Sequence, residues 1–380
     1  MPRRAAFVLI LCAAAVLASP SYADDWSVCK DESAPAADAI DACTRIIKAG
    51  KTKGNDLAIT YYNRAISYRQ KNDSEAALGD YNESIRINPK YPKAFNNRGN
   101  IWKEKGDLDR AIADYDEAIK LDPKFALAYA NRGDVWDDKG DANRATADLD
   151  QALRLDPKYA RAYNVRGVVW KKKGELDKAI ADFGEAIRND PKSAIAYVNR
   201  GDAWDDKGDP DRAIADLTEA IRIAPNNARA YNIRGVIQRN RNNLDRALAD
   251  YTDAIRSDPQ YVIAYLNRGN VYRDRGDQDR AIADYTDAIR INPKSDVAYL
   301  RRSEAWMKKG DRLAALRDAD EAVNLDPKDP SNYANRAAVM RALSRNEDAI
   351  ADLRKGLTLN PSETRKKQIE TALQELGVTP

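Results

Sequence analysis

Residues 194–227 read AIAYVNRGDAWDDKGDPDRAIADLTEAIRIAPNN, and this stretch decides the fold because the chain repeats its pattern. Its proline at 225 belongs to a set that recurs every 34 residues. Proline cannot continue a helix and disfavours helical conformation in the residue before it, so each proline marks a helix end. Nine prolines in one register indicate one structural unit copied along the chain. The set is Pro89, Pro123, Pro157, Pro191, Pro225, Pro259, Pro293, Pro327 and Pro361.

Each unit reads as two amphipathic helices joined by a tight turn. Positions are counted from residue 58, so that the recurring proline stands at position 32. Small residues at positions 8 and 20, such as Gly201 and Ala213, allow two helix axes to approach closely. Gly208 is expected to end the first helix in a left-handed conformation, and Asp209 is expected to cap the second. The pattern therefore predicts a helix hairpin per unit.

These residues strongly resemble the tetratricopeptide repeat family over residues 58–363. The resemblance implies an all-α fold, a solenoid in which tandem helix hairpins form a right-handed superhelix. It also implies a concave groove lined by the first helices, and binding of a protein or peptide rather than catalysis. The nine expected repeats are 58–91, 92–125, 126–159, 160–193, 194–227, 228–261, 262–295, 296–329 and 330–363.

The first 23 residues have the pattern of a secretory signal peptide. A basic start at Arg3 and Arg4 precedes an apolar run over 5–18, and Ser21-Tyr22-Ala23 supplies a small-x-small end. The apolar run is short for a bilayer span, although a retained membrane anchor is the alternative. We therefore expect an exported chain, periplasmic or extracellular, without a membrane span after cleavage of residues 1–23.

The segments that flank the repeats are predicted to cap them. Cleavage leaves two cysteines, Cys29 and Cys43, and an even pair in an exported chain favours one disulfide over two free thiols. The bridge would tie a helix over 35–49 to the start of an N-terminal helical cap, residues 24–57. Residues 364–380 are expected to form a C-terminal capping helix.

Composition argues against several classes of function. The 63 Lys and Arg residues nearly balance the 60 Asp and Glu residues, so the chain lacks the excess charge of a nucleic-acid binder. Histidine is absent, which removes the commonest general base and the commonest transition-metal ligand. We expect that the chain is not an enzyme and binds no cofactor or metal. The weaker alternatives are a glycoside hydrolase that uses paired carboxylates, and calcium binding by the carboxylates of residues 205–211.

Arginine at position 7 and aspartate at position 23 occur in every predicted repeat. One lies on each helix of the hairpin, so we expect an ion pair between the helices with a structural role. The alternative is that the arginines bind phosphate groups of a ligand. The arginines are Arg64, Arg98, Arg132, Arg166, Arg200, Arg234, Arg268, Arg302 and Arg336, and the aspartates are Asp80, Asp114, Asp148, Asp182, Asp216, Asp250, Asp284, Asp318 and Asp352.

Asparagine recurs at position 6 of the first helix. In the resembled family, an asparagine here faces the groove and holds the backbone of an extended peptide. One amide offers both a donor and an acceptor, so it can bind any peptide group. The alternatives are a solvated polar face or hydrogen bonds to neighbouring repeats. The residues are Asn63, Asn97, Asn131, Asn199, Asn267 and Asn335.

Charge alternates every second repeat in the middle of the chain. The third and fifth repeats carry acidic residues where the fourth and sixth carry basic ones. The rows either neutralise one another or select an extended partner of mixed charge. The predicted partner-binding residues are Asp134, Asp137, Asp202 and Asp205, with Arg161, Lys171, Lys172, Arg229 and Arg239.

The sequence thus predicts a non-catalytic scaffold of the cell envelope that binds an extended segment of a partner protein in the concave groove. A subunit of an envelope secretion or polysaccharide-export assembly is the alternative. In that case the convex face would pack on another subunit. The sequence does not identify the partner.

Overall fold

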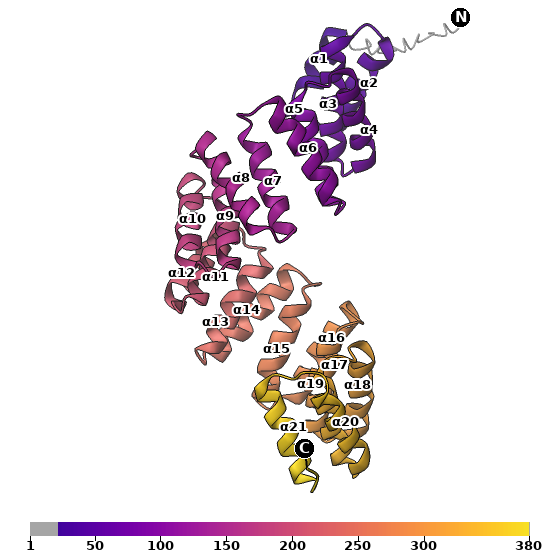
Figure 1. The fold of residues 1–380 in the computed structure, drawn as a ribbon, viewed down its shortest axis with the longest axis vertical. Helices are drawn as coiled ribbons and strands as arrows, with labels where there is room; N and C mark the ends of the chain where they lie inside the picture. Colours follow the sequence, from indigo (N-terminus) through magenta and orange to yellow (C-terminus); the bar gives the residue numbers. More distant parts are fainter. Residues whose placement is uncertain (1–21, 380) are drawn as a thin grey trace, which may run out of the picture. The chain divides into compact units, whose positions relative to one another are not determined.

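A computed structural model of the chain describes residues 22–379, which form α-helices joined by short turns, with no strand in that range. The chain divides into two units, Met1–Val169 and Trp170–Pro380, and each is described by itself. Figure 1 shows the helices in chain order, coloured along the sequence. The predicted signal peptide lies almost wholly outside the described residues.

The first unit contains two N-terminal helices followed by helix hairpins. In each hairpin a first helix packs against the second helix that follows it, as α3 does on α4 and α5 on α6. The last helix, α9, continues into the other unit. The helices are α1 (Tyr22–Lys30), α2 (Ala36–Ala49), α3 (Gly54–Gln70), α4 (Ser74–Ile87), α5 (Pro92–Glu104), α6 (Leu108–Leu121), α7 (Ala126–Asp138), α8 (Ala142–Leu155) and α9 (Ala160–Lys172).

The second unit continues the same arrangement and ends with a single helix, α21, packed on α19 and α20. First helices of successive hairpins also contact one another, for example α11 with α13 and α15 with α17. The helices are α10 (Leu176–Asn189), α11 (Ala194–Asp206), α12 (Pro210–Ile223), α13 (Ala228–Asn240), α14 (Leu244–Ser257), α15 (Val262–Asp274), α16 (Gln278–Ile291), α17 (Asp296–Lys309), α18 (Arg312–Leu325), α19 (Pro330–Ala342), α20 (Asn346–Leu357) and α21 (Glu363–Glu375).

The turn between α11 and α12 has the predicted chemistry. Gly208 follows α11 with φ of 84°, a left-handed conformation that favours glycine. Asp209 then caps α12, because its carboxylate accepts a hydrogen bond from the backbone N–H of Arg212 at 3.0 Å. Pro210 occupies the first turn of α12, where its missing N–H has no helical partner to lose. The predicted glycine and aspartate turn is confirmed here.

Small residues bring the two helices of a hairpin together, as predicted. A Cβ atom placed on Gly201 would lie 3.0 Å from Cγ of Leu217 and 3.1 Å from the carbonyl oxygen of Ala213. Contacts this short would force the helices apart, because a packed interior has little free volume. Position 8 therefore has to be small wherever position 24 carries a large side chain.

The large residue at position 24 fills the centre of the hairpin. Tyr115 and Tyr285 are fully buried, and their hydroxyls donate to Oδ1 of Asn100 at 2.8 Å and of Asn270 at 2.9 Å. Tyr251 is equally buried, but its hydroxyl has no hydrogen-bond partner. The reason is local, since position 9 of that repeat is Val236 instead of asparagine.

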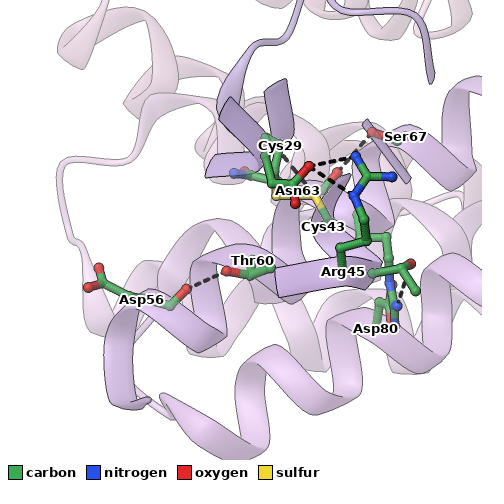
Figure 2. The surroundings of a disulfide bond; sticks show 11 residues. Cys29, Cys43, Arg45, Asp56, Thr60, Asn63, Ser67 and Asp80 are labelled. Carbon is green, nitrogen blue, oxygen red and sulfur yellow. Dashed lines mark hydrogen bonds and ion pairs between the residues drawn. A yellow bond between two sulfur atoms is a disulfide. The ribbon is translucent and has the colours of Figure 1, made fainter. Parts of the chain in front are cut away.

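A disulfide between Cys29 and Cys43 joins α1 to α2, with an S–S distance of 2.06 Å (Figure 2). Both cysteines are buried. The same two helices are also held by Asp25, whose Oδ1 lies 2.5 Å from Nη2 of Arg45. The predicted bridge is present in the structure.

The predicted ion pair between the two helices of a hairpin is confirmed in eight of the described hairpins and is bidentate. In α15, Arg268 donates from Nη2 and Nε to the carboxylate of Asp284 at 2.7 and 3.0 Å. Its third nitrogen, Nη1, donates to Oγ1 of Thr252 on α14 at 3.1 Å, which links the preceding hairpin. These pairs form the Arg–Asp layer: Arg64–Asp80, Arg98–Asp114, Arg132–Asp148, Arg200–Asp216, Arg234–Asp250, Arg268–Asp284, Arg302–Asp318 and Arg336–Asp352.

Candidate binding surface

In each unit, positions 2, 5, 6, 9, 12 and 13 of the first helices lie on one face, which we call the first-helix surface of that unit. Residues three and four apart lie on the same side of a helix, so these positions share a face. Arg229, at position 2 of α13, donates to Oδ1 of Asn199 at 3.1 Å and to Oδ2 of Asp202 at 3.3 Å, both on α11. Side chains of successive first helices therefore meet across this surface.

In the first unit, the predicted acidic and basic residues contact one another. Nζ of Lys103 on α5 lies 2.7 Å from Asp134 and 3.1 Å from Asp138, both on α7. Arg161 on α9 reaches the same Asp134 from the other side at 3.2 Å. Asp137 lies on α7 between these carboxylates in the sequence. The charge rows of neighbouring helices thus bind one another.

The second unit repeats this contact with the equivalent residues. Lys171 lies 2.8 Å from Asp202 and 2.9 Å from Asp206 on α11, and Lys172 follows it at the end of α9. Asp205, on the same helix, makes no ion pair within the described residues. Burial raises the pKa of Asp205, and the nearby charges of Asp206 and Asp202 raise it further.

Further along the second unit, one more pair of first helices is joined. Arg239 on α13 binds Asp274 on α15 at 3.2 Å, and both side chains are partly exposed. Exposed pairs of this kind are worth about 0–1 kcal/mol, so a partner can compete for them. Selection of a partner by these charges stays a prediction.

The predicted asparagines point into the seams between first helices. Nδ2 of Asn131 donates to Oδ1 of Asn96 at 2.9 Å, and Nδ2 of Asn267 donates to Oδ1 of Asn232 at 2.9 Å. Asn97 donates to the hydroxyl of Tyr62 at 3.1 Å. These contacts are the neighbouring-repeat hydrogen bonds that the sequence left as an alternative.

Burial separates the members of this series. Asn131 and Asn199 are 2% and 5% exposed, so solvent hardly reaches them. Asn63 and Asn335 are less buried; Asn63 lies on α3 beside the disulfide (Figure 2), and Asn335 lies on α19 at the wall of a cavity. Asn97 and Asn267 are also only partly buried. Peptide binding by the series stays a prediction.

Sequence reasoning missed a set of exposed aliphatic side chains. Ile195, Ile263 and Val297 are 57%, 51% and 44% exposed, and each stands at position 2 of a first helix, α11, α15 or α17. We call them the aliphatic row. In the described part of the chain, the other large aliphatic side chain of this exposure is Leu313 on α18. The signal was available, because position 2 is arginine in alternate repeats, at 161 and 229.

A cavity of about 470 Å³ opens on the first-helix surface near the C-terminal end. Side chains of α15, α17, α19 and α21 line it. Arg301 and Lys308 lie on one wall, Met307 and Ala338 contribute apolar surface, and Arg365 reaches the cavity from α21. The cavity lies at the end of the repeats, where the single helix α21 follows the hairpin of α19 and α20.

Over residues 22–379, no helix is both long and apolar enough to cross a membrane. In the same range no group of three or more Asp, Glu, His or Cys side chains is arranged to hold a metal ion.

Comparison with solved structures shows the same fold in other proteins. The structure is similar to a tetratricopeptide repeat protein from Parabacteroides merdae, with 19% identity and a TM-score of 0.51 over 65% of this chain and 98% of that one. The Cut9–Hcn1 complex of the APC/C matches at 15% identity and a TM-score of 0.52, over 93% and 84% of the two chains. A human IFIT1 dimer with m7Gppp-AAAA matches at 15% and 0.54, over 92% and 87%.

Family models match most of the repeat region. The tetratricopeptide repeat description matches residues 58–91, 130–194, 171–228 and 234–296, and the TPR repeat description matches residues 99–136. Among curated proteins, none matches the chain. The matched residues hold the hairpins, the small positions and the Arg–Asp layer described above. The chain belongs to the tetratricopeptide repeat family.

Proposed function

We propose that the chain is a non-catalytic scaffold of the cell envelope that binds an extended segment of a partner protein along its first-helix surface. The observation that carries this proposal is the aliphatic row. Single exposed aliphatic residues are common on soluble proteins, but a set at one position of several first helices is typical of an interaction site. Membership of a family of interaction scaffolds supports the same proposal.

The charged residues between members of the row give the surface its selectivity. Arg229 on α13 occupies position 2 between Ile195 on α11 and Ile263 on α15. The side chain of Arg229 is 49% exposed, and its contact with Asp202 is 3.3 Å long. A partner carboxylate can therefore replace Asp202 at little cost. The preferred partner segment is extended, with an acidic side chain between two apolar ones.

The envelope location rests on two features of the chain. The first 23 residues have the pattern of a secretory signal, and the cysteines that remain are joined in a disulfide. Disulfides persist in oxidising compartments and are rare in the cytosol. Export of the mature chain is therefore part of the proposal.

The proposal is tested by removing the aliphatic row and looking for the partner. The variant Ile195→Ser, Ile263→Ser, Val297→Ser is compared with Leu313→Ser, which removes an aliphatic side chain of similar exposure from a second helix. Both are expressed in the native cells, crosslinked and recovered by pull-down. We expect the triple variant to lose the crosslinked partner and Leu313→Ser to keep it.

Each outcome has a defined meaning if the variants stay folded. All four side chains are largely exposed, so melting followed by circular dichroism should change little. Capture that survives the triple variant contradicts the proposal. Capture that is lost only in Leu313→Ser would place the partner on the second helices, as expected for a subunit of an envelope assembly.

A further inference from the structure

We infer that the cavity bounded by α15, α17, α19 and α21 binds an acidic segment of a partner protein that carries one large apolar side chain. The inference rests on the proposed function, because it names the chemistry of a partner at one end of the first-helix surface. The cavity's charge, its apolar lining and the amide of Asn335 carry the inference, and we call it the terminal cavity.

The lining of the terminal cavity is positively charged. Arg273, Arg301, Lys308 and Arg365 line it, together with the carboxylate of Glu304. Arg273 and Arg301 share that carboxylate, the Arg301 contact being 3.1 Å long, and Arg273 also pairs with Asp274 at 3.2 Å. The remaining cations, Lys308 and Arg365, leave a positive potential that attracts an acidic ligand.

Two of these cations have no counter-ion. Lys308 and Arg365 make no ion pair within the described residues, and Arg365 is only half exposed. A half-buried guanidinium has lost part of its hydration, so a ligand carboxylate that binds it in a bidentate manner gains more than at a fully exposed site. Lys103 on α5 and Lys171 on α9 differ, because each of them already pairs with two carboxylates.

The sequence departs from the repeat pattern at the same place. Position 6 is asparagine in most repeats, but it is Arg301 in the repeat that forms this wall. Position 12 is charged in the preceding repeats, but here it is Met307. The change brings a long cation and a flexible apolar side chain into one cavity, which suits a ligand with both kinds of group.

The lining also has an apolar part and a side-chain amide. Met307 and Ala338 contribute apolar surface, and about 470 Å³ accommodates one large side chain with its backbone. Asn335 lines the same cavity, and the N–H groups of its amide can donate to a backbone carbonyl of a bound segment.

Direct binding of a defined peptide tests the inference. The probe is a fluorescein-labelled peptide, Gly-Ser-Glu-Glu-Leu-Glu-Glu-Ser-Gly, with an amidated C-terminus, titrated with the full chain by fluorescence anisotropy. We expect saturable binding that weakens when the glutamates are replaced by glutamines, and also when the leucine is replaced by alanine. An unchanged Kd after replacement of the leucine by alanine would contradict the claim that an apolar side chain is bound.

Matched variants locate the binding. Arg301→Gln with Arg365→Gln should raise the Kd of the probe roughly tenfold, which corresponds to the loss of two charge-assisted contacts. Arg312→Gln with Lys328→Gln removes the same charge from exposed positions outside the cavity and should leave the Kd within about twofold. Equal weakening in both variants means non-specific attraction and overturns the inference, as does a probe that does not bind.

The remaining outcomes separate this inference from the proposed function. A probe that binds only with a free C-terminal carboxylate would show that the cavity binds the C-terminus of a partner. That result would contradict binding of an internal segment. If the probe fails to bind while the aliphatic-row variant still loses its crosslinked partner, the result contradicts binding at the terminal cavity and leaves the proposed function supported. A probe that binds the cavity, while the aliphatic-row variant keeps its partner, sustains the cavity and contradicts the proposed surface.

Discussion

The Arg–Asp layer and the first-helix surface are made by the same helices but obey different rules. In the layer, arginine and aspartate recur at fixed positions of every predicted repeat, and the described pairs are bidentate and mostly buried. On the first-helix surface, position 2 changes from isoleucine at 195 to arginine at 229 and back to isoleucine at 263. A structural role demands the same contact in each repeat, whereas recognition of a partner demands differences between repeats.

The layer owes its uniformity to the position of its arginines between three helices. Most of these arginines bind the second helix of their own hairpin and also the helix that precedes it, as Arg234 does with Asp250 and Thr218. No shorter or uncharged side chain makes both contacts. On the first-helix surface, each side chain contacts only its neighbours in the seam, and substitutions there are tolerated.

The largest expected effect comes from breaking one pair of the layer. Arg268→Met should lower the free energy of unfolding by about 3–5 kcal/mol, because it leaves the buried carboxylate of Asp284 without its counter-ion. The matched control is Arg290→Met, which breaks an exposed pair with Asp287 and should cost about 0–1 kcal/mol. Urea unfolding, fitted with a nearest-neighbour repeat model, measures both. Equal costs would show that the layer is not what holds the hairpins.

A smaller effect is expected where the core meets the first-helix surface. Tyr115→Phe should cost about 1 kcal/mol, because it removes the hydroxyl that binds Asn100 and leaves the amide oxygen without this donor. Tyr251→Phe should be neutral or stabilising, because the hydroxyl it removes is buried and unpaired. The same unfolding experiment compares the two variants. A loss in Tyr251→Phe equal to that in Tyr115→Phe would mean that the Tyr251 hydroxyl has a partner.

The smallest expected effect is the loss of stability at low pH. It arises from the aspartate caps in the turns and not from the Arg–Asp layer. Hydrogen bonds from backbone N–H groups and arginine side chains lower the pKa of the caps Asp107, Asp141 and Asp209. Since this pKa is lower in the folded chain than in the unfolded chain, the ionised caps stabilise the fold at neutral pH. That contribution is lost as the pH falls below about 4.

The layer should respond differently to the same change. Burial raises the pKa of Asp284, so protonation at low pH does not weaken the fold at this position. We therefore expect the melting temperature to fall below about pH 4, and to fall less when the three caps are replaced by asparagine. Asparagine still caps a helix but does not titrate. An unchanged pH profile in that variant would exclude the caps as the acid-sensitive groups.

The fold and its structural contacts could be predicted from sequence because each rests on residues that recur in one register. Gly208, Asp209 and the arginine–aspartate pairs show the same spacing in repeat after repeat, and local geometry then decides their contacts. The disulfide followed from Cys29 and Cys43 being the cysteines left beyond the predicted leader.

The candidate site was less predictable because its contacts form between repeats. The burial of Asn131 depends on how closely α5 and α7 pack. The 34-residue spacing of the asparagines in the sequence does not predict that distance. The exposure of Ile195 likewise follows from its neighbours and not from its own position. The terminal cavity arises only where α21 replaces another hairpin, so no repeat pattern contains it.

The central claim is that the first-helix surface meets a partner while the second helices do not. Site-specific photocrosslinking in the native cells tests it directly, with p-benzoylphenylalanine placed either at Ile263 or at Leu313. Both side chains are more than half exposed, at 51% and 64%, so neither substitution should disturb packing. We predict a crosslinked protein adduct from position 263 and none from position 313. An adduct from position 313 alone, or from neither position, would contradict the claim.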